Sequence, residues 1–122
     1  MKKAVLLMAL GMATSWAGGA LAADDLKAAG EAAWKKFNCA SCHGADAKTP
    51  LNPEYPILAG QHADYLRQSL MAYQRGQAGA PATSNIRKNA VMGAMASTLA
   101  QSDIDSISAW LASLPGPLSV RK

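Results

Sequence analysis

The chain has 122 residues, half of them hydrophobic, and a formal net charge of +4. A chain of this length holds one domain with a modest hydrophobic core. Two lysines lie in an N-terminal segment that we expect to be removed, which leaves 10 Lys and Arg against 8 Asp and Glu, a net charge of +2. A charge this small argues against nucleic-acid binding.

The first 22 residues have the order of a secretory signal peptide: two lysines, an apolar run, and the small-residue triplet Ala20-Leu21-Ala22. Cleavage after Ala22 would leave residues 23–122 as a single domain. The apolar run is interrupted by Gly, Ser and Thr, whereas a membrane anchor needs about 20 uninterrupted apolar residues. The sequence therefore predicts an exported, soluble protein with no membrane span after cleavage.

Three segments have apolar residues at helical spacing, and none has the alternation of a strand. The first covers residues 25–38, with Asp24 or Asp25 as its N-cap. The second covers residues 63–75, and Gly76 is expected to end it. The apolar stripe of this second helix consists of Tyr65, Leu66, Ser69, Leu70 and Tyr73.

The third helix is predicted to follow Ser102 as N-cap, with Asp105 three residues later in a near capping box, and to end before Pro115. Its buried face holds Ile104, Ile107, Trp110, Leu111 and Leu114. The two connecting segments are long and rich in Pro, Gly and polar residues, which is uncommon in a compact domain unless the loops wrap something. The pattern indicates an all-α domain whose core is completed by another component.

The stretch "FNCASCHGAD", residues 37–46, holds the chain's only two cysteines, Cys39 and Cys42, followed by His43. A structural zinc site needs four Cys or His ligands, and the fourth, His62, is distant. A redox dithiol normally follows a strand of an α/β fold. A disulfide across two residues closes a very small loop and stabilises little. The remaining interpretation is C-x-x-C-H, a c-type haem attachment site.

The spacing of this motif has a chemical reason. Cysteines at i and i+3 lie on the same side of a helical turn, so both sulfurs can reach the two vinyl groups on one porphyrin edge. The histidine that follows then projects toward the iron. For the opposite face of the iron, the candidates are His62, Met71, Met92 and Met95. The last two lie in a small-residue stretch expected to be a flexible loop, and spacing alone does not choose between them.

Three features together carry a resemblance to a known family: the haem motif within "AGEAAWKKFNCASCHG", the segment "PILAGQHADYL", and a methionine seven residues before a leucine ahead of the last helix. The chain resembles a class I c-type cytochrome, most closely the small periplasmic cytochrome c553 type, which is similar to one half of di-haem cytochrome c4. The resemblance covers the whole mature chain. It implies three to five helices wrapped around one covalent haem.

The resemblance also assigns roles to residues. Met92 stands seven residues before Leu99 and is therefore implied as the second axial ligand, with Met95 as the alternative. The carbonyl of Pro56 is implied as acceptor for the second ring N–H of His43, and Leu58 is expected to pack on the haem.

Further implied features concern packing and charge. Gly30 should allow a close crossing of the first and last helices, with Trp34 and Trp110 near the contact; many relatives carry tyrosine in place of Trp110. A haem propionate should find a partner among three arginines that the sequence does not separate: Arg67, Arg75 and Arg87.

An iron with both axial positions filled by His and Met has no open site for a substrate, so the expected protein is a one-electron carrier and not an enzyme. Redox proteins are its expected donor and acceptor, and we expect a periplasmic monomer or weak dimer that binds no small-molecule substrate. Four basic residues are candidates for steering a partner: Lys35, Lys36, Arg87 and Lys88. The alternatives are a tightly bound electron-accepting subunit of a periplasmic oxidoreductase, and a five-coordinate haem sensor or peroxidatic protein.

Overall fold

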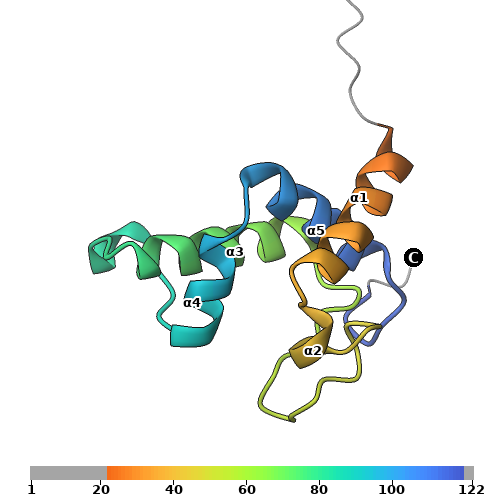
Figure 1. The fold of residues 1–122 in the computed structure, drawn as a ribbon, viewed down its shortest axis with the longest axis horizontal. Coiled ribbons are helices and arrows are strands. Elements are labelled where there is room, and N and C mark those ends of the chain that lie inside the picture. Colours follow the sequence, from red (N-terminus) through yellow and green to blue (C-terminus); the bar gives the residue numbers. More distant parts are fainter. Residues whose placement is uncertain (1–21, 120–122) are drawn as a thin grey trace, which may run out of the picture.

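The computed structural model describes residues 22–119, so the predicted signal peptide lies outside the described residues except for its last position. Within this range the chain is all-helical, without a strand, as predicted. No helix in the described part is long and apolar enough to span a membrane. The helices, shown in Figure 1, are α1 (Ala23–Lys36), α2 (Ala40–His43), α3 (Ala63–Gln77), the 3-10 turn η1 (Ala82–Ser84), α4 (Ala90–Ser97) and α5 (Gln101–Ser113).

The first and last helices cross closely at Gly30, as predicted. A Cβ atom at this position would collide with the carbonyl of Ser106 and lie 2.6 Å from the Cβ atom of Trp110. The absence of a side chain therefore lets the two backbones meet. Beside the crossing, the rings of Trp34 and Trp110 lie 5.4 Å apart between centroids. This contact joins the two ends of the domain and forms one side of the hydrophobic core.

Helix α5 supplies the centre of that core. Ile104, Ile107 and Leu111 are each at most 2 % exposed, and Trp110 is buried beside them. The predicted N-cap was wrong, because the helix begins at Gln101 and Ala100 is its N-cap. The carboxylate of Asp103 accepts a hydrogen bond from the Ala100 N–H at 2.9 Å. This bond provides the side-chain interaction at the start of the helix that we had expected from the Ser102 hydroxyl.

Helix α1 also starts earlier than predicted. It begins at Ala23, and neither Asp24 nor Asp25 is its N-cap. Both carboxylates instead lie in the first turn, where negative charge interacts favourably with the helix dipole. The N-cap prediction failed because an acidic residue stabilises a helix both at the N-cap position and in the first turn, so its presence does not show where the helix begins.

Helix α3 continues through Gly76 to Gln77, so the predicted stop at this glycine was wrong. The segment after η1 lies against the helix there: the N–H of Arg87 donates to the carbonyl of Ala72 at 3.0 Å. A Cβ atom on Gly76 would collide with the carbonyl of Arg87. The glycine is present because a neighbouring backbone needs the space, and the left-handed turn that follows the helix belongs to Gly79, with φ +76°.

Helix α4 was not expected, since its sequence "AVMGAMAS" has no amphipathic pattern. The Asn89 side chain caps it by accepting the N–H of Met92 at 2.9 Å. Gly93 and Ala96 are buried, which lets the helix pack against α3. In Figure 1, α2 and α4 lie on opposite sides of the lower half of the molecule, below α3. The space between these two helices is a cavity that both of them line.

Candidate functional site

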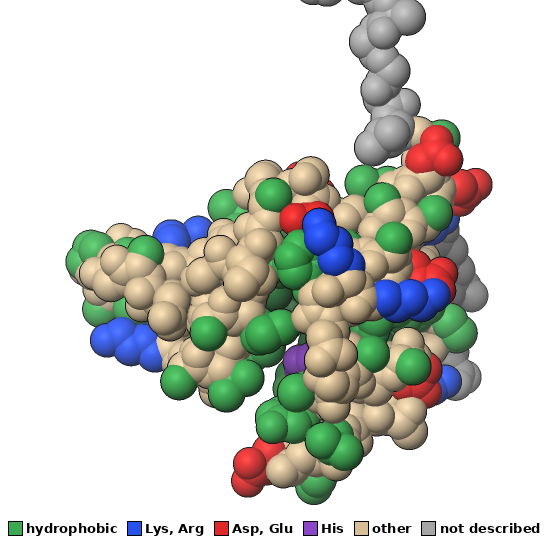
Figure 2. Space-filling view, viewed as in Figure 1, with side chains coloured by type: hydrophobic (Ala, Val, Ile, Leu, Met, Phe, Trp, Pro, Cys, Tyr) green, Lys and Arg blue, Asp and Glu red, His purple; other side chains and the backbone are tan. Residues whose placement is uncertain are grey.

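A cavity of about 460 Å³ opens between α4 and the part of the chain formed by α1 and α2. Its size is in the range of small-molecule and cofactor sites, roughly 300–1,000 Å³. All five α-helices contribute side chains to its wall, together with residues 54–58. Figure 2 shows a hollow in this place, with a histidine visible inside it and hydrophobic side chains on both sides.

Both cysteines of the motif line this cavity from the start of α2. The helical turn that places them on one side is closed by hydrogen bonds from the N–H groups of Cys42 and His43 to the carbonyl of Cys39, at 3.3 and 3.1 Å. The two thiols are not bonded to each other. Burial raises the pKa of the Cys39 thiol, whereas a redox dithiol needs a lowered pKa at its attacking sulfur.

The imidazole of His43 is 6 % exposed and also lines the cavity. Its Nδ1 lies 3.1 Å from the carbonyl oxygen of Pro56. A carbonyl oxygen only accepts, so Nδ1 carries the proton and donates it, and Nε2 keeps the lone pair that a metal needs. Burial lowers the pKa of His43, which favours the neutral ring. The predicted partner Pro56 therefore occupies the expected position.

The loop after His43 is folded back on the motif by main-chain bonds. The N–H of Leu51 donates to the carbonyl of Cys42 at 3.0 Å. Leu58 and Ala59 both donate to the carbonyl of Ala47, at 2.9 and 3.0 Å. These bonds bring Pro56 and Leu58 to the cavity wall. The ring of Trp34 lies 6.0 Å from that of His43 between centroids and closes the inner side.

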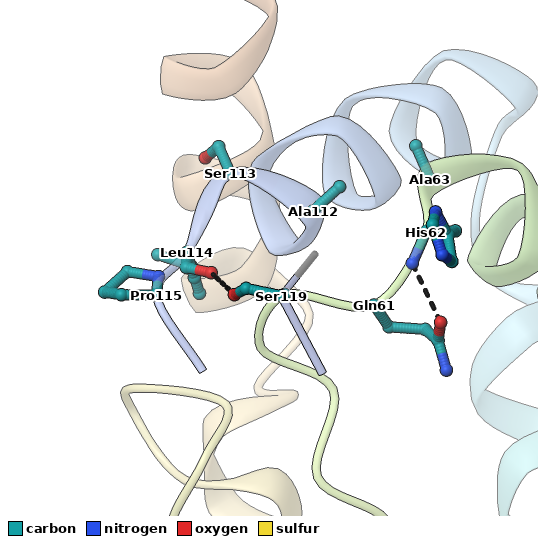
Figure 3. Close-up of a pocket in the computed structure, with 9 residues that line it drawn as sticks. Gln61, His62, Ala63, Ala112, Ser113, Leu114, Pro115 and Ser119 are labelled. Atoms are coloured by element: carbon teal, nitrogen blue, oxygen red, sulfur yellow. Dashed lines mark hydrogen bonds between the residues drawn. The ribbon is translucent and has the colours of Figure 1, made fainter. Parts of the chain in front are cut away.

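Met92 and Met95 both line the cavity from the side of α4. They stand three residues apart on a helix and therefore share a face, so the expectation of a loop was wrong while the expectation that they reach the site fits the geometry. Neither of the other two candidates lines this cavity. Met71 packs against the hydrophobic core. His62 precedes α3 and lines a different pocket beside the end of α5, shown in Figure 3.

The three arginines are separated by their contacts. Arg67 is paired with Asp105 at 2.7 Å. Arg75 donates to the carbonyl of Asn85 at 2.9 Å. Only Arg87 lines the cavity. The basic side chains of Lys35, Lys36 and Lys88 are exposed and do not line it.

Two residues that sequence reasoning missed hold α4 in place. Asn89 caps its first turn, and Gln74 of α3 donates from Nε2 to the carbonyls of Ala96 and Leu99, at 2.8 and 2.9 Å. The asparagine was detectable, because an Asn directly before an apolar run such as residues 90–92 is a helix-start signal. The contact of Gln74 depends on tertiary packing and had no signal in the sequence.

The arrangement fits a covalently attached haem. Two thiols one helical turn apart, an imidazole with a free Nε2, thioethers on the facing helix and mainly apolar walls are the groups that such a cofactor requires. A zinc site has less support, since no group of three or more His, Cys, Asp or Glu side chains in residues 22–119 is placed to hold a metal ion.

Comparison with known proteins also indicates a protein that carries a covalently attached haem. The family model described as cytochrome c matches residues 27–115. Cytochrome c-554(548) of Halomonas halodenitrificans is 42% identical over 78 residues, which cover 62% of this chain and 82% of the relative. The thiosulfate dehydrogenase electron acceptor of Stutzerimonas stutzeri is 34% identical over 79 residues, covering 65% of this chain and 32% of the relative. Cytochrome c4 of Azotobacter vinelandii is 32% identical over 76 residues, covering 62% and 34%.

The chain thus spans most of one of these relatives and about a third of the other two. The family match covers the haem motif, the cavity and all five α-helices apart from the first four residues of α1. The chain belongs to the cytochrome c family, a family of electron-transfer proteins that carry a covalently bound haem c.

Proposed function

We propose that this chain is a soluble periplasmic one-electron carrier in which Cys39 and Cys42 hold the haem, and His43 and Met92 are the axial ligands of its iron. The observation that carries the proposal is that a single cavity is lined by both cysteines, by His43 and by the methionines of α4. These groups come from opposite sides of the cavity, so they are suited to hold a flat cofactor between them.

Each side chain has a task in this proposal. The two sulfurs form thioethers that fix the cofactor to α2. His43, oriented by the Pro56 carbonyl, offers Nε2 to the iron, and the neutral ring favoured by its burial is the ligating form. Met92 would bind the iron from the side of α4, and Leu58, which also lines the cavity, would help to keep water away from the cofactor. When bound, the haem supplies a ferric–ferrous couple, whose potential a methionine ligand raises.

Filling both axial positions explains the absence of catalysis in this proposal. With His43 and Met92 both bound to the iron, no position would remain for a substrate, and the protein would only exchange electrons with a partner. The two methionines share one helical face, so the structure alone leaves Met95 as the alternative ligand. The choice of Met92 is supported by its position seven residues before Leu99 in the pattern that the chain resembles.

The most direct test of covalent attachment is a pyridine haemochrome spectrum combined with a haem-stained denaturing gel of the exported protein. We expect one haem c per chain, retained after denaturation. A colourless protein with both thiols free or joined to each other would refute the assignment. An intact mass or N-terminal sequence of the same sample tests the start at residue 23, and with it the proposed export to the periplasm.

A second candidate function is a cytochrome subunit held by a periplasmic oxidoreductase. It is favoured by one relative, which is named as an electron acceptor of thiosulfate dehydrogenase. Gel filtration of native extract separates the two. A free carrier elutes near the mass of the monomer or a weak dimer, whereas a subunit elutes with its enzyme.

A further inference from the structure

The chain after the last helix packs against the loop that carries Pro56, and a glycine in each segment makes the contact possible. A Cβ atom on Gly116 would collide with the carbonyl oxygen of Ala59 and lie 3.1 Å from its Cβ atom. A Cβ atom on Gly60 would collide with the hydroxyl of Ser119 and lie 2.8 Å from its backbone nitrogen. Because neither glycine has a side chain, the two backbones can lie in direct contact.

Residues 114–119 form a closed turn, which we call the C-terminal clasp. The N–H of Gly116 donates to the hydroxyl oxygen of Ser119 at 3.0 Å, and the N–H of Ser119 donates to the carbonyl of Gly116 at 3.1 Å. The Ser119 hydroxyl in turn donates to the carbonyl of Leu114 at 3.2 Å, as Figure 3 shows. The two prolines of the clasp restrict its backbone further, because each ring fixes its own φ. The clasp is therefore ordered by its own bonds at the place where it meets the loop.

The loop is anchored at residues 58–60, whose first two N–H groups donate to the carbonyl of Ala47. The third, that of Gly60, donates to the carbonyl of Leu111 in the last turn of α5 at 2.9 Å. Ala47 is fully buried and has φ +53°, a left-handed conformation that is uncommon for a residue with a Cβ atom and persists only where its surroundings hold it. The anchor thus contains a strained residue, and the clasp contacts Ala59, one of the two residues bonded to it.

The carbonyl of Pro56 has no comparable anchor of its own. Proline has no N–H to donate, and neither Pro56 nor Ile57 takes part in a main-chain hydrogen bond within residues 22–119. Both residues are also exposed. The preceding bond, from the Tyr55 N–H to the Asn52 carbonyl, lies within the loop. The position of the Pro56 carbonyl, 3.1 Å from Nδ1 of His43, therefore depends on the anchored residues that follow it.

We propose that the C-terminal clasp positions the Pro56 carbonyl by holding residues 58–60, and thereby sets how strongly His43 donates to the iron. The proposal rests on the proposed function, in which His43 is an axial ligand. A hydrogen bond from Nδ1 makes the imidazole a stronger donor, which stabilises the more positive ferric state. Weakening this bond would therefore raise the reduction potential. The residues of the clasp are positioning residues, since none of them lines the cavity.

The test compares two shortened holoproteins with the wild type. One chain ends at Ser119 and keeps the clasp, whereas the other ends at Leu114 and lacks residues 115–119. Both lose Arg121 and Lys122, and residues 115–119 carry no charged side chain, so the two shortened chains have the same net charge. The pyridine haemochrome confirms that each of them carries haem.

Nuclear magnetic resonance of the ferrous proteins measures the exchange of two N–H groups with D2O: the ring Nδ1–H of His43 and the backbone N–H of Met92. In the chain that ends at Leu114, we expect the ring N–H to exchange about tenfold faster than in the chain that ends at Ser119. Its reduction potential should also be higher. The Met92 N–H should exchange at the same rate in both chains, because it is bonded to Asn89 on the other side of the cavity.

Equal ring N–H exchange and equal potentials in the two shortened chains would overturn the proposal. A Met92 N–H that accelerates as much as the ring N–H would overturn it too, because the clasp would then stabilise the domain as a whole. Failure of the proposed function is distinguishable from both results, since the wild type would then carry no covalent haem.

A substitution replaces the shorter chain if that chain does not accumulate. Gly116→Ala adds a methyl group that collides with the carbonyl of Ala59, and it should accelerate the exchange of the ring N–H in the same way. Leu118→Ala, at an exposed position of the same segment, is its control and should behave as the wild type. Equal exchange rates in these two variants would overturn the proposal.

Discussion

The two sides of the cavity are built in different ways. The histidine wall, formed by α2 and residues 44–59, is held by main-chain hydrogen bonds, among them those to the carbonyls of Cys42 and Ala47. The methionine wall, formed by residues 89–97, has no main-chain hydrogen bond to another helix in the described part of the chain. It is held by the Asn89 cap, by the amide of Gln74 and by close packing of small residues.

The difference indicates which wall of the cavity tolerates the replacement of a side chain and which does not. A main-chain bond survives replacement of a side chain, so single substitutions leave the histidine wall largely intact. The hydrogen bonds that fix the methionine wall come from the side chains of Asn89 and Gln74, so a single substitution can remove them. We therefore expect ligation to weaken first on the methionine side.

The largest effect should come from removing the covalent link on the histidine wall, with Cys39→Ala and Cys42→Ala combined. Without the cofactor, a cavity of 460 Å³ would cost at most about 11 kcal/mol at roughly 24 cal/mol per Å³. That is comparable to the entire stability of a small domain, about 5–15 kcal/mol. Circular dichroism should show a largely unfolded chain. Ser41→Ala, which alters the middle of the motif, is the control and should stay folded with its haem.

Gln74→Glu should produce the next largest effect, on the methionine wall. One amide donates to two carbonyls, of Ala96 and Leu99, and a carboxylate would place acceptors against acceptors. Leaving such groups unsatisfied costs about 2 kcal/mol in the free energy of unfolding. Denaturant unfolding measures this loss, and added imidazole should displace the methionine more readily. The matched control is Gln68→Glu, an exposed position on the same helix; equal behaviour of the two variants would contradict a special role for Gln74.

Asn89→Ala should cause a smaller loss, about 1 kcal/mol, because it removes the N-cap of α4. Asn89→Asp keeps an acceptor for the Met92 N–H and should restore most of the stability. Urea unfolding of the three holoproteins checks this. If Asn89→Ala matches the wild type, the cap does not hold the methionine wall.

The smallest effect concerns a turn of the histidine wall. The Thr49 hydroxyl and the N–H groups of Lys48 and Thr49 donate to Asp46 and lower its pKa to about 2. Since the pKa is depressed on folding, the contribution of Asp46 is complete above the ordinary value of about 4 and is lost as the pH falls to about 2. The stability difference between wild type and Asp46→Asn should therefore shrink across this window. A difference that does not change with pH would contradict the account.

The sequence predicted the histidine wall better than the methionine wall, because the histidine wall depends on residues that are close together in the chain. The spacing of Cys39, Cys42 and His43 is local chemistry, and one helical turn brings them together. The crossing at Gly30 was expected from the resemblance to class I c-type cytochromes, and the absence of a side chain at this position permits the close approach. These features depend on neighbours in the chain or on a strong pattern.

The remaining features depend on tertiary contacts. Helix α4 has no amphipathic period, since alanine, glycine and methionine occupy most of it, and its cap and its contact with Gln74 decide its position. Gly76 was taken for a helix stop, whereas the glycine is needed for the close approach of the Arg87 backbone, eleven residues later in the chain. The choice of Arg87 among three arginines likewise required knowing which of them were already paired.

The measurement that tests the central claim most directly is the near-infrared charge-transfer band of a methionine–iron bond in the ferric protein. We expect the band to be present in the wild type and in Met95→Ala and absent in Met92→Ala. Loss of the band in Met95→Ala with retention in Met92→Ala would assign the ligand to the other methionine. Absence of the band in the wild type would contradict the claim that the two walls close on one iron.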